Sequence, residues 1–110
     1  MALRAEAADE AEPVLPPSLV IDLSGVRTPE GLQRLLQREL WFPDFYGRNW
    51  DAFWDAITGL VELPEELVLT GWPTFSAVLP GEAQMLRERL DAYLAEYGSR
   101  RPVPRRIHYR

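Results

Sequence analysis

The stretch FYGRNWDAFWDAITG, residues 45–59, decides the fold because it combines a clearly marked short helix with an unusual pair of acids. Asn49 is a typical N-cap and Gly59 a typical helix end, so a helix is predicted between them. An advance of about 100° per residue places four apolar side chains on one face: Trp50, Phe53, Trp54 and Ile57. The same rotation places a polar stripe beside Trp54, made of Asp51, Asp55 and Thr58.

The two aspartates are four positions apart, so their carboxylates share one side of the helix. Asp51 falls in the first turn, where an acid gains about 0.3–1 kcal/mol from the helix dipole. Asp55 lies beyond that turn and repels Asp51 by about 0.2–0.5 kcal/mol. The predicted helix contains no arginine or lysine that would relieve this repulsion. A solvated helix face over an aromatic core is the simplest explanation, and it fits Asp51 well but Asp55 less well. A helix that keeps such a pair is therefore a candidate for holding it toward something outside the helix.

Such a pair has three possible external uses. Paired carboxylates perform acid–base hydrolysis, but that requires a cleft and two different pKa values. Two aspartates can also bind a divalent cation, yet the sequence shows no further cluster of ligands. The third use is presentation to a basic pocket on another protein, where charge-assisted contacts supply orientation and speed. Trp54 favours this use, because tryptophan is enriched among the residues that dominate interface energies.

Outward from this helix, short apolar runs alternate with longer amphipathic segments. Thr28 as N-cap, followed by Pro29 and Glu30, indicates a helix over 28–40. Strands are predicted at 18–25, 66–71 and 106–110, a long helix at 82–98, and loops at 41–47 and 72–81, the second loop with one helical turn at most. Helices that separate short apolar strands indicate an α/β fold, a three-stranded parallel sheet packed with helices through right-handed crossovers.

Length and composition indicate one small domain. The chain has 110 residues, 46% of them apolar, and no cysteine, so disulfides and thiolate metal sites are excluded. Residues 1–17 are rich in alanine and glutamate and end in prolines, which predicts a disordered acidic leader before a single domain over 18–110. The sequence shows neither a secretory signal nor an apolar run long enough for a membrane span, so we expect a cytoplasmic protein.

The charge is distributed unevenly along the chain, whose formal net charge is −5. Residues 43–97 hold ten acids and three arginines, whereas residues 98–110 hold five arginines and no acid. An acidic middle repels nucleic acid and favours a basic partner. We therefore expect no direct nucleic-acid binding.

Residues 46–59 also match a specific pattern, Tyr-Gly-x-Asn-x-Asp-Ala-x-Trp-Asp-x-x-Thr-Gly, without a gap. Its fixed positions are Tyr46, Gly47, Asn49, Asp51, Ala52, Trp54, Asp55, Thr58 and Gly59. The likeness continues through Val61, Glu62 and Pro64. With the order of elements over about residues 19–109, the chain resembles the barstar family, intracellular inhibitors of secreted ribonucleases such as barnase.

The resemblance implies a protein that is not an enzyme and needs no cofactor or metal. It would inhibit a secreted microbial, guanyl-specific ribonuclease with a basic active site, as a monomer that forms a one-to-one heterodimer with its target. In this family the helix and the loop before it plug the nuclease active site, and the acids stand where RNA phosphates would bind.

The resemblance also assigns residues to this contact. Asp55 would enter the phosphate site of the nuclease and Asp51 would lie beside it. Asp55 matches the family's aspartate whose truncation is a known example of a very large loss of affinity. The surrounding contact residues would be Phe45, Asn49, Trp50, Trp54, Thr58, Gly59 and Glu62.

Three departures from the family pattern keep a second hypothesis open. Phe45 stands where barstar has a tyrosine, and Leu60 replaces a tryptophan. A glutamate of the penultimate helix has no single match, and the nearby acids are Glu88, Asp91 and Glu96. The rival hypothesis is a barstar-fold interaction or immunity module whose partner is not a ribonuclease. A metal-dependent hydrolase is a more distant alternative.

Overall fold

A computed structural model of the chain describes residues 15–98 and 103–110. Its three strands are β2 (Ser18–Asp22), β3 (Glu66–Thr70) and β4 (Arg106–Tyr109). They form a parallel sheet in the order β2-β3-β4, with Ile21 paired to Leu69 and Leu67 to Ile107. The predicted three-stranded parallel sheet is therefore confirmed.

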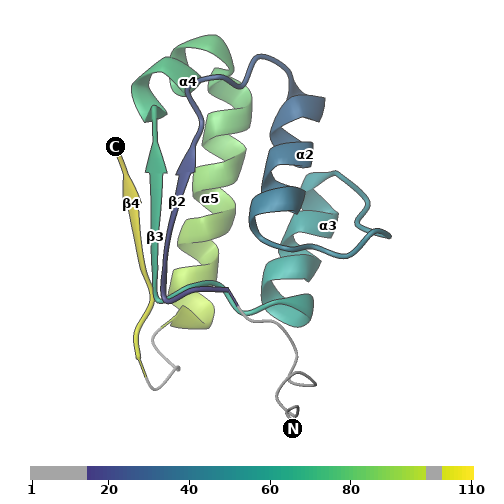
Figure 1. Cartoon of the computed structure of the whole chain (residues 1–110), viewed down its shortest axis with the longest axis vertical. Coiled ribbons are helices and arrows are strands. Elements are labelled where there is room, and N and C mark those ends of the chain that lie inside the picture. Colours follow the sequence, from purple (N-terminus) through teal and green to yellow (C-terminus); the bar gives the residue numbers. More distant parts are fainter. Residues whose placement is uncertain (1–14, 99–102) are drawn as a thin grey trace, which may run out of the picture.

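The helices lie to one side of this sheet, and α4 lies at its upper end (Figure 1). They are α2 (Pro29–Glu39), α3 (Trp50–Asp55), the π-helical turn η1 (Ala56–Leu60), α4 (Trp72–Val78) and α5 (Pro80–Glu96). Strands that follow one another in sheet order, joined by crossovers of one hand, carry their connecting helices to the same face. This connectivity explains the two-layer arrangement of sheet and helices.

The two faces of the sheet consequently differ. On the helix side, Ile21, Leu67 and Leu69 are buried and belong to the single hydrophobic core. On the other side, Val20 remains 57% exposed, although a parallel sheet is usually covered on both faces. None of the helices in the described ranges is long and apolar enough to cross a bilayer.

Helix α2 begins as predicted. The Thr28 hydroxyl accepts a hydrogen bond from the Gly31 N–H at 3.0 Å, and Pro29 occupies the first helical turn. The leucines of α2 form a stripe that faces the core, with Leu32 and Leu36 fully buried. Gln33 is buried as well, although it is polar.

The buried amide of Gln33 has a specific partner in the loop before α3. The Tyr46 hydroxyl donates a hydrogen bond to Gln33 Oε1, and the Tyr46 ring packs 4.7 Å from the Phe42 ring. Burial raises the pKa of the Tyr46 phenol, so this group stays protonated and remains a donor. The hydrogen bond therefore ties the loop over 41–49 to α2.

The prediction of a loop over 72–81 is wrong, because the structure has a seven-residue helix, α4, followed by α5 from Pro80. Gly71 and the prolines of this stretch suggested a loop. Gly71 instead takes a left-handed conformation (φ 69°) as the N-cap of α4, and a proline fits the first turn of a helix. Phe75 is then fully buried and fixes α4 to the core.

The helix predicted after Asn49 is present, but it changes from an α-helix to a π-helix halfway along. Six residues form α3, and the next five form the π turn, in which the Val61 N–H donates to the Ala56 carbonyl at 3.0 Å. The helical segment continues one residue past Gly59, the predicted end. Such π turns are rare and are frequently found at functional sites.

The acidic leader predicted over residues 1–17 lies mainly outside the described residues, which begin at residue 15. Leu15 packs against the core, and the Pro17 carbonyl accepts a hydrogen bond from the Glu66 N–H at 2.9 Å. The disorder of the leader stays a prediction.

A first test concerns the turn between β3 and α4. A Cβ atom at Gly71 would lie 2.6 Å from the Ser24 backbone nitrogen, and the positive φ is unfavourable for alanine. We expect Gly71→Ala to lower the free energy of unfolding by about 1–3 kcal/mol, measured by urea denaturation. Gly25→Ala is the control, because its Cβ would meet no atom within 4 Å. Equal stabilities of the two variants would contradict this account of the turn.

A second test concerns the loop before α3. Replacing Tyr46 by phenylalanine leaves the buried Gln33 amide oxygen without its donor, so we expect a loss of about 1–3 kcal/mol in urea denaturation. Tyr109→Phe is the matched control, since its hydroxyl makes only a long, exposed hydrogen bond of 3.4 Å to Asp91. A loss at Tyr46 no larger than that at Tyr109 would show that the hydrogen bond does not secure the loop.

Candidate functional site

Helix α3 is held in a fixed orientation from both its start and its buried face. The Asn49 side-chain oxygen accepts a hydrogen bond from the Ala52 N–H at 2.7 Å, which confirms the predicted N-cap. Phe53 is fully buried and meets the Phe42 and Trp50 rings edge-on, at centroid distances of 5.9 and 5.4 Å. These contacts fix which residues of α3 face outward.

The outward face carries the two predicted aspartates. Asp51 and Asp55 are both exposed, and within residues 15–98 and 103–110 neither carboxylate makes a hydrogen bond or an ion pair. They line a cleft of about 440 Å³ between α3 and α5. The other residues of this acidic cleft are Trp54, Arg89, Ala92 and Glu96. The carboxylates are therefore available to a ligand or partner.

Trp54 forms the aromatic wall of the acidic cleft. Its side chain is half-buried, and its ring lies 6.3 Å from the Tyr97 ring. Tyr97 in turn stacks on the fully buried Tyr93, with ring centroids 6.0 Å apart and planes 27° apart. This aromatic row connects Trp54 to the core through α5, so the exposed part of the indole is held rigidly.

The π turn presents the next part of the site. The Thr58 hydroxyl donates a hydrogen bond to the Trp54 carbonyl at 2.7 Å, which occupies that hydroxyl within its own helix. Gly59 is exposed, and a Cβ atom there would meet nothing within 4 Å. Because Gly59 has no side chain, its exposed backbone forms part of the wall of a groove that runs along residues 58–65.

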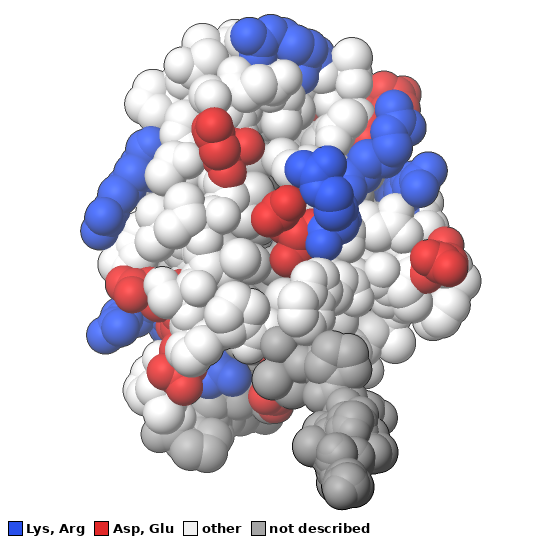
Figure 2. Space-filling view, viewed as in Figure 1, with Lys and Arg blue, Asp and Glu red and all other residues white. Residues whose placement is uncertain are grey.

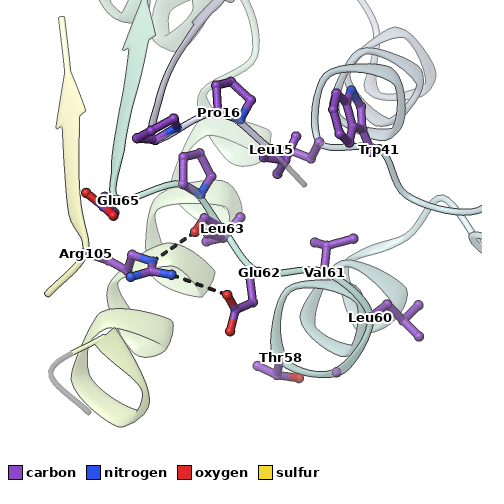
Figure 3. A pocket seen from close by; sticks show the side chains of 14 residues that line it. Leu15, Pro16, Trp41, Thr58, Leu60, Val61, Glu62, Leu63, Glu65 and Arg105 are labelled. Atoms are coloured by element: carbon purple, nitrogen blue, oxygen red, sulfur yellow. Dashed lines mark hydrogen bonds and ion pairs between the residues drawn. The ribbon is translucent and has the colours of Figure 1, made fainter. Parts of the chain in front are cut away.

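A groove of about 860 Å³ lies on the other side of the π turn (Figure 3). Its apolar end is formed by Trp41 and Leu60, each 49% exposed, together with Leu15. Trp41 has a positive φ of 61°, a conformation that is unusual for a bulky residue and often occurs at binding sites. Thr58, Gly59 and the predicted Glu62 line the same groove.

Arg105 fixes the polar end of this groove, where Figure 3 shows dashed lines from its guanidinium to Leu63 and to Glu62. Only 10% of the Arg105 side chain is exposed. Its Nε donates to the Leu63 carbonyl at 2.9 Å, and its Nη2 lies 3.7 Å from Glu62 Oε1. The segment after the π turn is thereby attached to the chain just before β4.

The remaining predicted contact residues lie outside the cleft and the groove. Phe45 is 76% exposed on the loop before α3. Asn49 uses its side chain as the N-cap. Trp50 is half-buried and donates from its indole nitrogen to Glu82 of α5 at 3.2 Å, so its polar atom is engaged within the protein.

The structure distinguishes among the three acids that the sequence left as candidates on the long helix. Glu96 lines the acidic cleft. Neither Glu88 nor Asp91 is among the residues that line the cleft. Their carboxylates are engaged elsewhere, since Glu88 accepts a hydrogen bond from Gln84 at 3.0 Å and Asp91 accepts one from Tyr109 at 3.4 Å. Sequence reasoning missed Arg89 and Trp41, since neither belongs to the motif and only the tertiary structure brings them to the site.

On the face seen in Figure 2, acidic and basic side chains are scattered among uncharged ones, and several of opposite charge lie side by side. The acidic cleft is different, because three acids and one arginine surround a half-exposed indole. Exposed carboxylates on rigid elements favour cationic groups, and charge-assisted hydrogen bonds to arginine or protonated histidine are the strongest contacts they make. The site is thus suited to binding a basic surface.

Two comparisons with known proteins bear on the family of this chain. A family model described as Barstar (barnase inhibitor) matches residues 17–110. The chain is also 49% identical over 51 residues to "Putative ribonuclease inhibitor YrdF" of Bacillus subtilis (strain 168), an overlap of 46% of this chain and 56% of that relative. The chain thus spans about half the length of the relative. Because the family model covers nearly all of its described residues, the chain belongs to the barstar family.

Proposed function

We propose that this protein is a stoichiometric inhibitor of a secreted microbial, guanyl-specific ribonuclease. In this proposal α3 and the loop before it cover the nuclease active site. The observation that carries the proposal is the pair Asp51 and Asp55, exposed and without partners among the described residues, beside the fixed indole of Trp54. A barstar-family chain with a relative named as a ribonuclease inhibitor makes a ribonuclease the first partner to test.

Charge supports this assignment. A ribonuclease must hold the phosphates of RNA, so its site carries cations, and an acidic helix is complementary to it. Asp55 would take the place of a phosphate, and Asp51 would stand beside it. Because α3 is already ordered, little conformational entropy is lost when the two proteins associate.

The groove beside the π turn would extend the contact. The family pattern has a tryptophan where this chain has Leu60, and Trp41 lies at the same apolar end of the groove. Trp41 would therefore supply aromatic surface from a different segment of the chain. Phe45, which is largely exposed on the adjacent loop, would add apolar area without the hydroxyl contact of a tyrosine.

The proposed complex contains one copy of each protein and forms in the cytoplasm, before the nuclease is secreted. The rival hypothesis is a barstar-fold module that binds a protein other than a ribonuclease. The changes at Phe45 and Leu60 favour this rival, whereas the unpaired aspartates favour the inhibitor.

The main test is a titration of barnase and two other guanyl-specific ribonucleases with this protein, following RNA cleavage. We expect the wild-type protein to abolish cleavage of at least one of them near a one-to-one ratio. Asp55→Ala should weaken inhibition at least about thirtyfold, as expected for a hot-spot residue. Because the Asp55 carboxylate makes no hydrogen bond or ion pair with the described residues, the variant should keep its melting temperature. Inhibition that is unchanged in Asp55→Ala would exclude the proposed active-site plug.

The third acid provides a separate test on α5. Glu96 lines the acidic cleft and Glu88 does not, so Glu96→Ala should weaken inhibition about five- to thirtyfold while Glu88→Ala leaves it within twofold. Both variants remove one negative charge, so their long-range attraction to a basic nuclease is matched. Equal effects at both positions would show that α5 contributes only net charge and no contact.

A further inference from the structure

Arg89 is a cation in a cleft that is otherwise acidic. It belongs to α5 and lines the acidic cleft with Asp51, Asp55 and Glu96, where its side chain is partly buried. The family resemblance assigns it no role. The binding of a basic surface does not explain why an arginine lies in this cleft, because a cation there repels such a surface.

The Arg89 guanidinium has no partner among the residues that the structure describes. No described carboxylate oxygen lies within 4.0 Å of its nitrogens, the distance that defines an ion pair, and the guanidinium donates no hydrogen bond to a described residue. Arg87, two positions earlier on α5, is engaged, because its guanidinium carbon lies 4.2 Å above the Tyr109 ring. Arg105 is engaged with Leu63 and Glu62. Arg89 is therefore not used to neutralise the acids of its own cleft.

A partner that closes the acidic cleft would change the surroundings of Arg89. Closure removes water from the guanidinium, and a desolvated cation without an anion is strongly unfavourable. The nearby aspartates cannot serve this purpose if they are paired with cations of the partner. An occupant that fits the whole cleft must therefore bring an anion for Arg89 together with cations for the acids.

The inference rests on the proposed function and specifies its target. We propose that Arg89 pairs with a carboxylate of the ribonuclease that borders the phosphate-binding cations of its active site. Cleavage of RNA requires a group that accepts a proton, and a carboxylate is a common choice for this role. Arg89 would thus select, among ribonucleases with basic sites, those that present an acid at this point.

The test is a double-mutant cycle between Arg89 and the active-site carboxylates of the nuclease that the wild-type protein binds best, among barnase and two other guanyl-specific ribonucleases. Each nuclease carboxylate is replaced by its amide, and the Kd is measured by calorimetry, which does not depend on catalysis. We expect Arg89→Ala to weaken binding to the unmodified nuclease at least about tenfold. The same change should have less than a twofold effect on one of the amide variants.

Two further variants separate this contact from general effects. Arg89→Lys keeps the charge but loses the two-pronged geometry, so its Kd should fall between those of wild type and Arg89→Ala. Arg34→Glu, on the exposed surface of α2 and outside the cleft and the groove, reverses a charge and should bind at least as tightly as wild type.

The outcomes are distinguishable. If wild type binds and inhibits a nuclease but Arg89→Ala binds equally well or more tightly, the pairing is wrong while the proposed function stands. If Arg89→Ala weakens binding equally for the unmodified nuclease and for every amide variant, no carboxylate is the partner and the inference fails. If wild type binds none of the ribonucleases, the proposed function fails and the inference fails with it.

Discussion

The candidate site depends on the burial of one side chain, Phe53. A helix of six residues is not stable by itself in water, because nucleation costs more than so few hydrogen bonds return. Phe53 anchors α3 in the core against Phe42, and the Asn49 cap fixes the first turn. Once these two contacts define the rotation of α3, Asp51 and Asp55 must face solvent.

The same arrangement concentrates unfavourable charge where binding is proposed. Two like charges four residues apart destabilise a helix, and neither aspartate has a compensating partner among the described residues. Stability is supplied elsewhere, by the Tyr46–Gln33 hydrogen bond and by the aromatic row from Trp54 to Tyr93. Because neither carboxylate is paired with another group of the described protein in the free state, both are ready for a partner.

Local signals in the sequence were sufficient to predict most of the elements. The caps at Thr28 and Asn49 and the apolar strands each depend on neighbouring residues, so a pattern of spacing reveals them. Helix α4 was missed because Gly71 and the prolines suggest a loop, and only the burial of Phe75 identifies the helix. The acids of α3 were likewise predictable, since they share one helix face. The approach of Arg89 from α5 was not, because it depends on how two distant segments pack.

The sheet face that carries no helix has a practical consequence. Val20 is exposed on this face. The helix layer that holds α3 lies on the opposite side of the sheet (Figure 1). A tether attached at this position would leave the acidic cleft unobstructed. The molecule could then be immobilised as an affinity reagent, with its recognition surface directed toward solution, to retrieve a binding partner from a mixture.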